Sequence, residues 1–157
     1  MTDLRLMALD AEDLQIISAH CQDAVMKTKD LMFEPQAGRF VLQVNRFVWE
    51  DRARQGKWAF FQRRIRQRRR AVLHFDRVVR VQQQGVAAGS SDEVLDLLAI
   101  AFHETDAPSG TVELVFAGNA TIRLEVECIE AQLTDLGAAW STDSEPNHYL
   151  TNPAAKL

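Results

Sequence analysis

The residues best suited to chemistry form a run of arginines in the middle of the chain. The run reads QRRIRQRRR at 62–70, and three aromatic residues, Trp58, Phe60 and Phe61, precede it. Planar guanidinium groups bind phosphate or carboxylate, and neighbouring aromatic rings can stack on nucleobases. We take Trp58 and Phe61 as candidate aromatic contacts. The candidate anion-binding or partner-binding residues are Arg63, Arg64, Arg66, Arg68, Arg69 and Arg70.

The basic character is confined to this part of the chain. Residues 46–80 hold 12 basic and 3 acidic residues, a charge of about +9. The remainder holds 6 basic and 19 acidic residues, about −13, and the sum is the net charge of −4. A basic segment of this kind suits an acidic partner protein or RNA. The ordinary alternative is a solvated loop that pairs with the protein's own acidic surface, and that surface would repel RNA.

His74 and Asp76 form a second, weaker candidate, because they share one face of an expected strand and could act as an acid–base pair. Residues two apart on a strand often share a face without touching, so a structural role is the ordinary alternative. No Gly-rich phosphate loop or nucleophile elbow occurs, and no histidines have metal-ligand spacing. We therefore expect no metal and no cofactor.

The elements that would position these residues centre on 94–136. Two strands with clean alternation, 111–116 and 121–126, flank a turn at Gly118-Asn119. An odd-numbered loop aligns apolar residues with apolar residues and opposite charges with each other. We therefore predict a loop of three or five residues, with Gly118 or Asn119 at positive φ. The predicted pairs are Leu114–Ile122, Val112–Leu124 and Glu113–Arg123.

The segments on either side of this hairpin complete the central unit. Val94–Phe102 is apolar on both faces, which predicts a central, well-covered strand. A C-terminal helix is expected over about 127–136, where apolar residues recur at helical spacing, and Gly137 would end it.

The sequence of the N-terminal half predicts one strand, one helix and one hairpin. A short strand is expected at 4–9, followed by a helix over about 10–25 with Asp10 as its N-cap. The hairpin joins 31–34 to 39–45 through PQAG, a four-residue turn. Its predicted pairs are Glu34–Arg39, Phe33–Phe40 and Leu31–Leu42.

The basic segment then interrupts the pattern. We interpret residues 50–68 as a loop insert that could include a helical turn, and the last arginines as the start of a strand. That strand continues over 71–83 and carries His74 and Asp76 on the face opposite Leu73. Length and composition favour a single globular domain over 1–140 with a polar, flexible tail over 141–157.

Cysteine content and hydropathy indicate a cytoplasmic protein. Cys21 and Cys128 have no metal or redox spacing and suit a reducing compartment. The sequence shows no secretory signal and no transmembrane segment. An exposed edge strand would allow a homodimer, although nothing in the sequence selects one.

Four stretches of the sequence resemble one family. They are LDAEDL at 9–14, NRFVWE at 45–50, LHFDRV at 73–78 and GTVELVFAG…IRLEVECIEAQLTDLG at 110–137. The resemblance is to a bacterial family of small uncharacterised proteins, catalogued among the domains of unknown function as family 2948. It covers nearly the whole chain, and it implies no reaction, ligand or catalytic residue.

Together these observations predict an α+β domain dominated by an antiparallel curled sheet or a pleckstrin-homology-like barrel, with two helices. The barrel is an analogy of topology, which does not determine function. The leading hypothesis is a non-enzymatic binding or adaptor module whose basic 52–70 segment contacts an acidic partner protein. The alternatives are an RNA-associated protein that uses the arginines, and a small enzyme or ligand binder with a site in the curled sheet.

Overall fold

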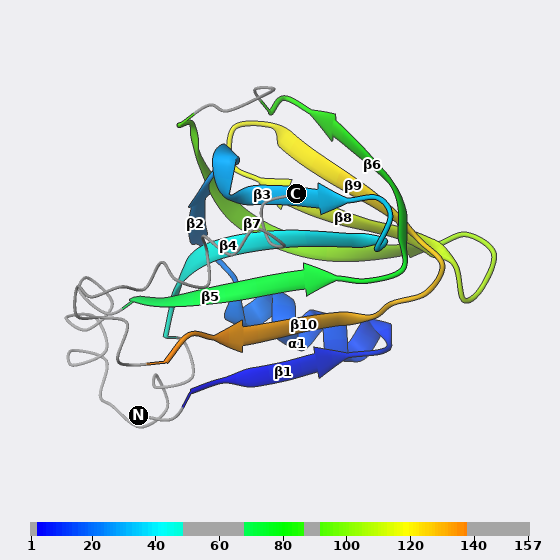
Figure 1. Ribbon diagram of the computed structural model, residues 1–157, viewed down its shortest axis with the longest axis horizontal. Coiled ribbons are helices and arrows are strands. Elements are labelled where there is room, and N and C mark those ends of the chain that lie inside the picture. Colours follow the sequence, from blue (N-terminus) through cyan, green and yellow to red (C-terminus); the bar gives the residue numbers. More distant parts are fainter. Residues whose placement is uncertain (1–2, 49–67, 87–91, 138–157) are drawn as a thin grey trace.

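The computed structural model describes residues 3–48, 68–86 and 92–137. They form a curled antiparallel sheet with one α-helix packed against it (Figure 1). The helix, α1, spans Ala11–His20, and a 3-10 helix, η1, spans Thr28–Asp30. The strands are β1 (Arg5–Ala8), β2 (Ala24–Lys27), β3 (Leu31–Glu34), β4 (Arg39–Phe47), β5 (Arg68–Phe75), β6 (Val78–Gln84), β7 (Val94–Glu104), β8 (Gly110–Phe116), β9 (Ala120–Val126) and β10 (Ala131–Asp135).

The strands lie in the order β1-β10-β5-β4-β2-β7-β8-β9-β6, and β3 pairs with β4 beside this path. Within the described residues the sheet is open, with β1 and β6 at its edges. The predicted curled antiparallel sheet is therefore confirmed. Helix α1 packs against β1 and β10 on one side and against β7 on the other. It thus spans the concave side of the curl.

Helix α1 begins as predicted and ends earlier. The Asp10 side chain caps it by accepting a hydrogen bond from the backbone N–H of Asp13 at 2.8 Å. The predicted continuation to residue 25 is wrong. The chain turns at Asp23, which has a φ of 65°, and residues 24–27 form β2 between β4 and β7. Strand pairing on both sides outweighs the weak helical preference of this stretch.

The predicted C-terminal helix over 127–136 is also wrong, because residues 131–135 form strand β10. The buried positions Ala131, Leu133 and Asp135 alternate with partly exposed ones, as expected for a strand with one covered face. β10 lies between β1 and β5, so its backbone is hydrogen-bonded along both edges. The apolar spacing fitted both a helix and a strand, and tertiary pairing decided between them.

Two further strand predictions need correction. Residues 71–83 do not form one strand, because the chain bends at Arg77, which has a φ of 62°. β5 ends at Phe75 and pairs with β4 and β10, whereas β6 pairs with β9. Val94–Phe102 is not covered on both faces, since Leu98 is 43% exposed. Because of a bulge between Leu97 and Ala99, the buried side chains are at odd positions before it (Leu95, Leu97) and at an even position after it (Ile100).

Both predicted hairpin registers are confirmed. β3 and β4 pair through Glu34–Arg39, Phe33–Phe40 and Leu31–Leu42. β8 and β9 pair through Leu114–Ile122, Val112–Leu124 and Glu113–Arg123. Gly118 and Asn119, in the loop between them, have φ values of 82° and 63°. In both cases burial and charge complementarity agreed on one register.

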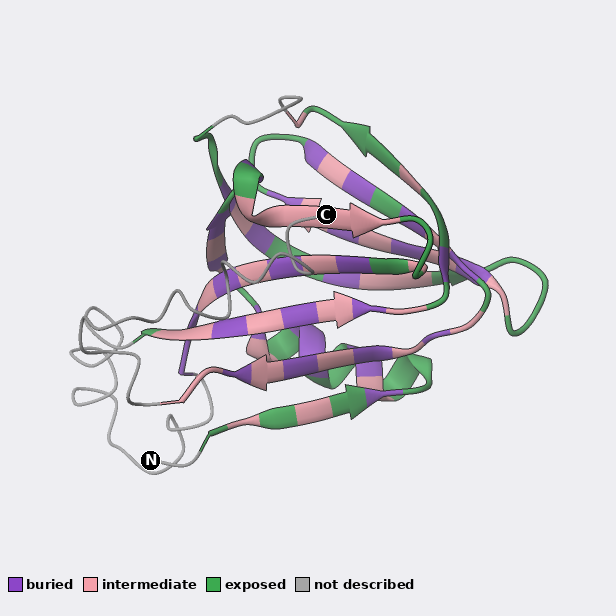
Figure 2. Ribbon diagram, viewed as in Figure 1, coloured by how far each residue is buried: buried purple, intermediate pink, exposed green. Residues whose placement is uncertain are grey.

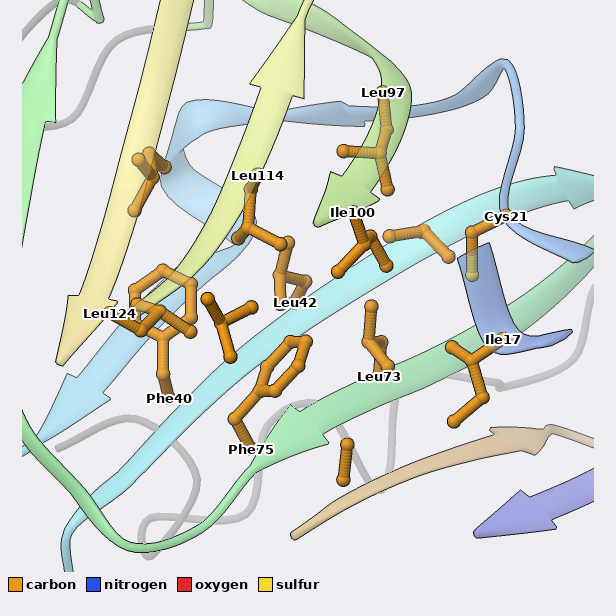
Figure 3. Close-up of a cluster of buried hydrophobic side chains, with 14 of the residues drawn as sticks. Ile17, Cys21, Phe40, Leu42, Leu73, Phe75, Leu97, Ile100, Leu114 and Leu124 are labelled. Atoms are coloured by element: carbon orange, nitrogen blue, oxygen red, sulfur yellow. The ribbon is translucent and has the colours of Figure 1, made fainter. Parts of the chain in front are cut away.

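The core fills the concave side of the sheet. Buried and less buried residues alternate along most strands (Figure 2). Figure 3 shows Ile17 and Cys21 of the α1 region packed among inward side chains of the sheet, including Leu42, Leu73 and Ile100. Two helix side chains also bind β7 just after its bulge: the Ser18 hydroxyl accepts from the Ile100 N–H at 2.9 Å, and Gln15 donates to the Ile100 carbonyl.

In the part of the chain that the structure describes, no helix is both long and apolar enough to cross a membrane.

The alternation on β8 predicts unequal costs for neighbouring substitutions. Leu114→Ala removes a side chain that is 0% exposed, and should lower the free energy of unfolding by about 2–5 kcal/mol. Val115→Ala changes a partly exposed side chain on the other face and should cost less than about 1 kcal/mol. Urea denaturation of both variants measures the difference. Equal losses would contradict the assigned faces.

Candidate functional site

The structure places only part of the candidate set. Arg68, Arg69 and Arg70 form the start of β5. The other candidates lie outside the described residues: Trp58, Phe61, Arg63, Arg64 and Arg66.

Strand alternation divides the three arginines between the two faces of the sheet. Arg69 lies opposite Arg46 of β4, on the same face as the core residues of both strands. Arg68 and Arg70 lie opposite Phe47 and Asn45, on the outer face. These three consecutive arginines therefore belong to two separate sites, Arg69 to an inner one and Arg68 and Arg70 to an outer one.

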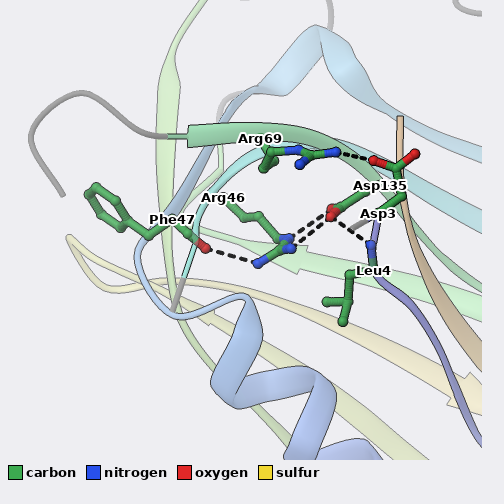
Figure 4. A network of polar contacts seen from close by, with 6 residues as sticks. All are labelled: Asp3, Leu4, Arg46, Phe47, Arg69 and Asp135. Atoms are coloured by element: carbon green, nitrogen blue, oxygen red, sulfur yellow. Dashed lines mark hydrogen bonds and ion pairs between the residues drawn. The ribbon is translucent and has the colours of Figure 1, made fainter. Parts of the chain in front are cut away.

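The inner site centres on a buried ion pair between Arg46 and Asp135, whose side chains are both 0% exposed. Arg46 Nε donates to one carboxylate oxygen at 2.9 Å, and a second guanidinium nitrogen donates to the other at 2.8 Å (Figure 4). The third nitrogen donates to the Phe47 carbonyl at 3.0 Å. The Leu4 N–H also donates to Asp135, at 3.0 Å. Both charges are thus hydrogen-bonded as well as paired, which burial requires.

This pair reaches across a strand, because β5 lies between β4 and β10. Asp135 lies opposite Ala71 of β5, and Arg46 lies opposite Arg69. The small side chain of Ala71 leaves room for the guanidinium to cross. Arg69 itself points the same way and pairs with Asp3 (Figure 4). Two arginines and two aspartates therefore neutralise one another at this end of the sheet.

Cys21 lies beside the same network and is chemically quiet. Burial raises the pKa of its thiol to about 12, and attraction from Arg46 only partly offsets this rise in pKa. The thiol is therefore protonated at neutral pH, which removes it as a nucleophile.

The outer site holds the other two arginines loosely. The Arg68 guanidinium carbon lies 3.9 Å from the centroid of the Phe47 ring, and one of its nitrogens donates to the Asn45 carbonyl at 3.4 Å. Arg70 donates to the side-chain oxygens of Asn45 and Gln43, both at 3.4 Å. These bonds are long, and an arginine has five N–H donors, so both guanidinium groups retain capacity for an anion.

On β4, β5 and β10, the described neighbours of Arg68 and Arg70 on the outer face are uncharged. Between the cross-strand pair of Arg68 and that of His74, no other described residue on the outer face of β4, β5 or β10 has a carboxylate. These residues are Val41, Gln43, Asn45, Phe47, Val72, Gln132 and Thr134. Across the strands, Arg70 lies opposite Asn45 of β4, Asn45 lies opposite Val25 of β2, and Val25 lies opposite Asp96 of β7. Burial raises the pKa of Asp96, the nearby Asp23 adds to the rise, and Arg68 opposes it.

His74 and Asp76 do come together, at the other end of β5. His74 Nδ1 lies 3.4 Å from Asp76 Oδ2, and this nitrogen has no hydrogen-bond partner among the described residues. Asp76 Oδ1 instead accepts from Arg39 Nε at 2.8 Å. Burial lowers the pKa of His74; Asp76 raises that pKa and Arg39 lowers it further. The imidazole is therefore neutral at pH 7.

A wide hollow of about 640 Å³ lies next to this pair. Asp76 and Arg39 line it, together with Arg77, Glu127 and Glu130, whereas His74 is not part of its lining. Arg77 pairs with both glutamates, at 3.6 and 3.4 Å. Cations and carboxylates thus already satisfy one another in the hollow. The catalytic role of His74 and Asp76 stays a prediction, and the described residues contain no cluster able to hold a metal ion.

Sequence reasoning did not find the Arg46–Asp135 pair. The available signal was position: Arg46 continues the inward series Phe40, Leu42 and Val44, and Asp135 continues the series of Leu133. A charged residue in phase with a buried face indicates a buried partner of opposite charge.

Comparison with family models gives one match, over residues 4–148, to a family described as "Protein of unknown function (DUF2948)". The chain belongs to the DUF2948 family. This confirms the resemblance found in the sequence. The match runs through every described strand and through the basic segment. Neither the curated proteins nor the solved structures gave a match to this DUF2948 protein.

The buried pair of the DUF2948 protein predicts a strong coupling between its two members. Arg46→Met or Asp135→Leu alone leaves a buried charge without its partner and should cost about 3–5 kcal/mol of unfolding free energy. The double variant removes both charges and should cost clearly less than the two single changes together. Urea denaturation of the three variants gives the coupling energy, and additive losses would contradict the pairing.

His74 predicts a pH dependence of stability. Its pKa in the folded DUF2948 protein lies below the ordinary value of 6.5, so protonation favours the unfolded state. The stabilisation from neutral His74 is therefore present above pH 6.5 and is lost as the pH falls below it. NMR titration should place the His74 midpoint below 6.5, and His74→Gln should weaken the loss of stability with acid. Gln132→Ala, at the residue opposite His74 on β10, removes no titratable group, so it is the control and should keep the wild-type loss.

Proposed function

We propose that this DUF2948 protein is a non-enzymatic binding module that holds an acidic segment of a partner protein against the outer face of β4 and β5. The observation that carries the proposal is the position of Arg68 and Arg70. They lie two residues apart on one outer face, and the described outward residues beside them on β4, β5 and β10 carry no carboxylate. The basic segment over 52–70 leads directly into this face.

The chemistry of the face suits a carboxylate-bearing peptide. Neither Arg68 nor Arg70 makes an ion pair with a carboxylate of the described chain, and both bind neutral oxygens through long hydrogen bonds. A side-chain carboxylate could replace those contacts with charge-assisted ones, which are shorter and stronger. The amides of Gln43, Asn45 and Gln132 could bind the peptide backbone between the acidic side chains.

RNA is the less favoured ligand for the same face. Stacking on a base requires an open aromatic ring, and the Phe47 ring already has the Arg68 guanidinium over one face. The chain as a whole also carries a net charge of −4. A polyphosphate meets this repulsion along its length, whereas a short acidic peptide contacts only the basic region.

Reduced cysteines support a cytoplasmic location. Cys21 and Cys128 are both free, although they are the only two cysteines of the chain. Free thiols are usual in a reducing compartment. The proposal does not depend on the pleckstrin-homology-like analogy, which stays a prediction and lacks the C-terminal helix on which it relied.

The test compares two double variants with the same loss of charge. Arg68→Ala with Arg70→Ala alters the proposed face, and Arg80→Ala with Arg123→Ala alters exposed arginines on β6 and β9. The probe is a short fluorescein-labelled oligoglutamate, measured by anisotropy. The first variant should bind about tenfold more weakly, because two exposed charge contacts are worth on the order of 1.4 kcal/mol. The second should bind like the wild type.

Salt and RNA complete this experiment. Oligoglutamate binding should weaken as salt rises, since the Debye length falls from about 30 Å at 0.01 M to about 8 Å at 0.15 M. Equal losses in the two variants would show a general charge effect and overturn the proposal. Tighter binding of a labelled single-stranded RNA than of oligoglutamate, lost in the first variant, would replace the acidic partner with RNA.

A further inference from the structure

A second, chemically different surface lies between strands β3 and β6. They flank a cleft of about 330 Å³, within the size range of ligand sites. Figure 1 shows β3 alongside β4, and β6 at the far margin of the sheet beside β9. The cleft is lined by Thr28, Leu31, Met32, Phe33, Phe40, Val81, Gln83 and Val86. None of these side chains is charged, although 25% of the chain's residues are.

The cleft is a place where the sheet fails to close. At one end the two sides meet: the Val78 N–H of β6 donates to the Gly38 carbonyl at 2.9 Å, in the turn between β3 and β4. Beyond this contact, within the described residues, β3 pairs only with β4 and β6 only with β9. Both strands therefore turn a backbone edge towards the cleft, and an edge of this kind can accept another strand.

Most of the surface that the cleft exposes is polar, but four apolar side chains around it are incompletely covered. Leu31 and Phe33 on β3, with Val81 and Val86 on the other side, pack against the core and remain only partly buried. Added apolar surface in the cleft would complete their burial, at about 25 cal/mol for each Å² removed from water.

Gln83 and Thr28 are the two polar side chains among the residues that line the cleft. On β6, Val81 lies opposite Leu124 and Gln83 lies opposite Ile122, and both partners on β9 are 0% exposed and point inward. Gln83 therefore occupies an inward position yet remains exposed at the mouth of the cleft. Its amide can donate to and accept from a ligand backbone. Its neighbour Gln82 lies opposite Arg123, on the outer face.

We infer that the cleft binds an extended polypeptide strand of a partner, with apolar side chains at alternate positions facing the core. Backbone edges on both sides favour a peptide over an apolar small molecule, because strand addition uses those donors and acceptors. The uncharged lining favours a neutral segment, so this ligand differs from the acidic one proposed for Arg68 and Arg70. The short β3 and the bulge between Val78 and Arg80 limit unselective pairing of the edges.

The probe is a pool of capped peptides about six residues long, the usual length of a strand. Val, Leu or Phe alternate in them with Thr, Ser or Gln. A second pool has the same composition in scrambled order. Affinity selection on the full-length protein should retain peptides of the alternating pool and leave the scrambled pool behind. Retention of both pools alike, or of neither, would overturn the inference.

Hydrogen exchange identifies the mode of binding. A retained peptide should slow the exchange of backbone amides on both β3 and β6, because strand addition hydrogen-bonds the two edges. Binding that leaves these amides unprotected would show a pocket for apolar groups in place of strand addition, and would also overturn the inference.

Two matched substitutions locate the site. Gln83→Glu places a carboxylate at the mouth of the uncharged cleft and should lower the affinity for the retained peptide about tenfold, because the bound peptide would desolvate the charge. Gln82→Glu makes the same change on the outer face of the same strand and should leave affinity within about twofold. Both residues are exposed, so both variants should fold. Equal effects would place the peptide elsewhere.

Discussion

The buried ion pair between Arg46 and Asp135 is the constraint on which this end of the sheet depends. Its two members belong to β4 and β10, which are separated by β5, so the pair joins three strands. Leu4 extends the connection to the start of β1, because its N–H and carbonyl both bind Asp135. Desolvating two charges is costly, and here every formal charge has both a partner and additional hydrogen bonds. The loss of either member would therefore affect all four strands.

The division of the arginines between two faces follows from strand geometry. Successive side chains of β5 point to opposite sides, so a run of basic residues cannot act as one patch once it enters a strand. Arg69 joins the inner network through Asp3, and its charge serves the fold. Arg68 and Arg70 remain outside, where their described neighbours on β4, β5 and β10 are uncharged. The candidate anion site is therefore smaller and better defined than the composition of the segment indicates.

The sequence was most informative where two physical signals agreed. Burial and charge pairing selected the same register in both hairpins, and the Asp10 cap was visible from residue type alone. Prediction failed where one signal served two structures. Leu133 fits helical and strand spacing equally, and only β1 and β5 on either side decide for β10. The bulge after Leu97 could not be predicted from the sequence. A bulged strand with one buried face and a regular strand buried on both faces give the same apolar pattern over 94–102. Arg46 was overlooked, since arginine is rarely buried.

The buried pair also determines which arginines of β5 lie on the outer face. A slip of β5 by one residue would carry Arg68 and Arg70 to the inner face and Arg69 to the outer face. Two arginines would then enter the core beside Arg46, and Asp135 could not neutralise them. A slip is therefore far more costly here than in a strand with an apolar inner face, where residues of similar kind would exchange places. The outer position of Arg68 and Arg70 is thus a consequence of charge balance inside the protein, and a change at Asp135 would disturb the proposed binding face without touching it.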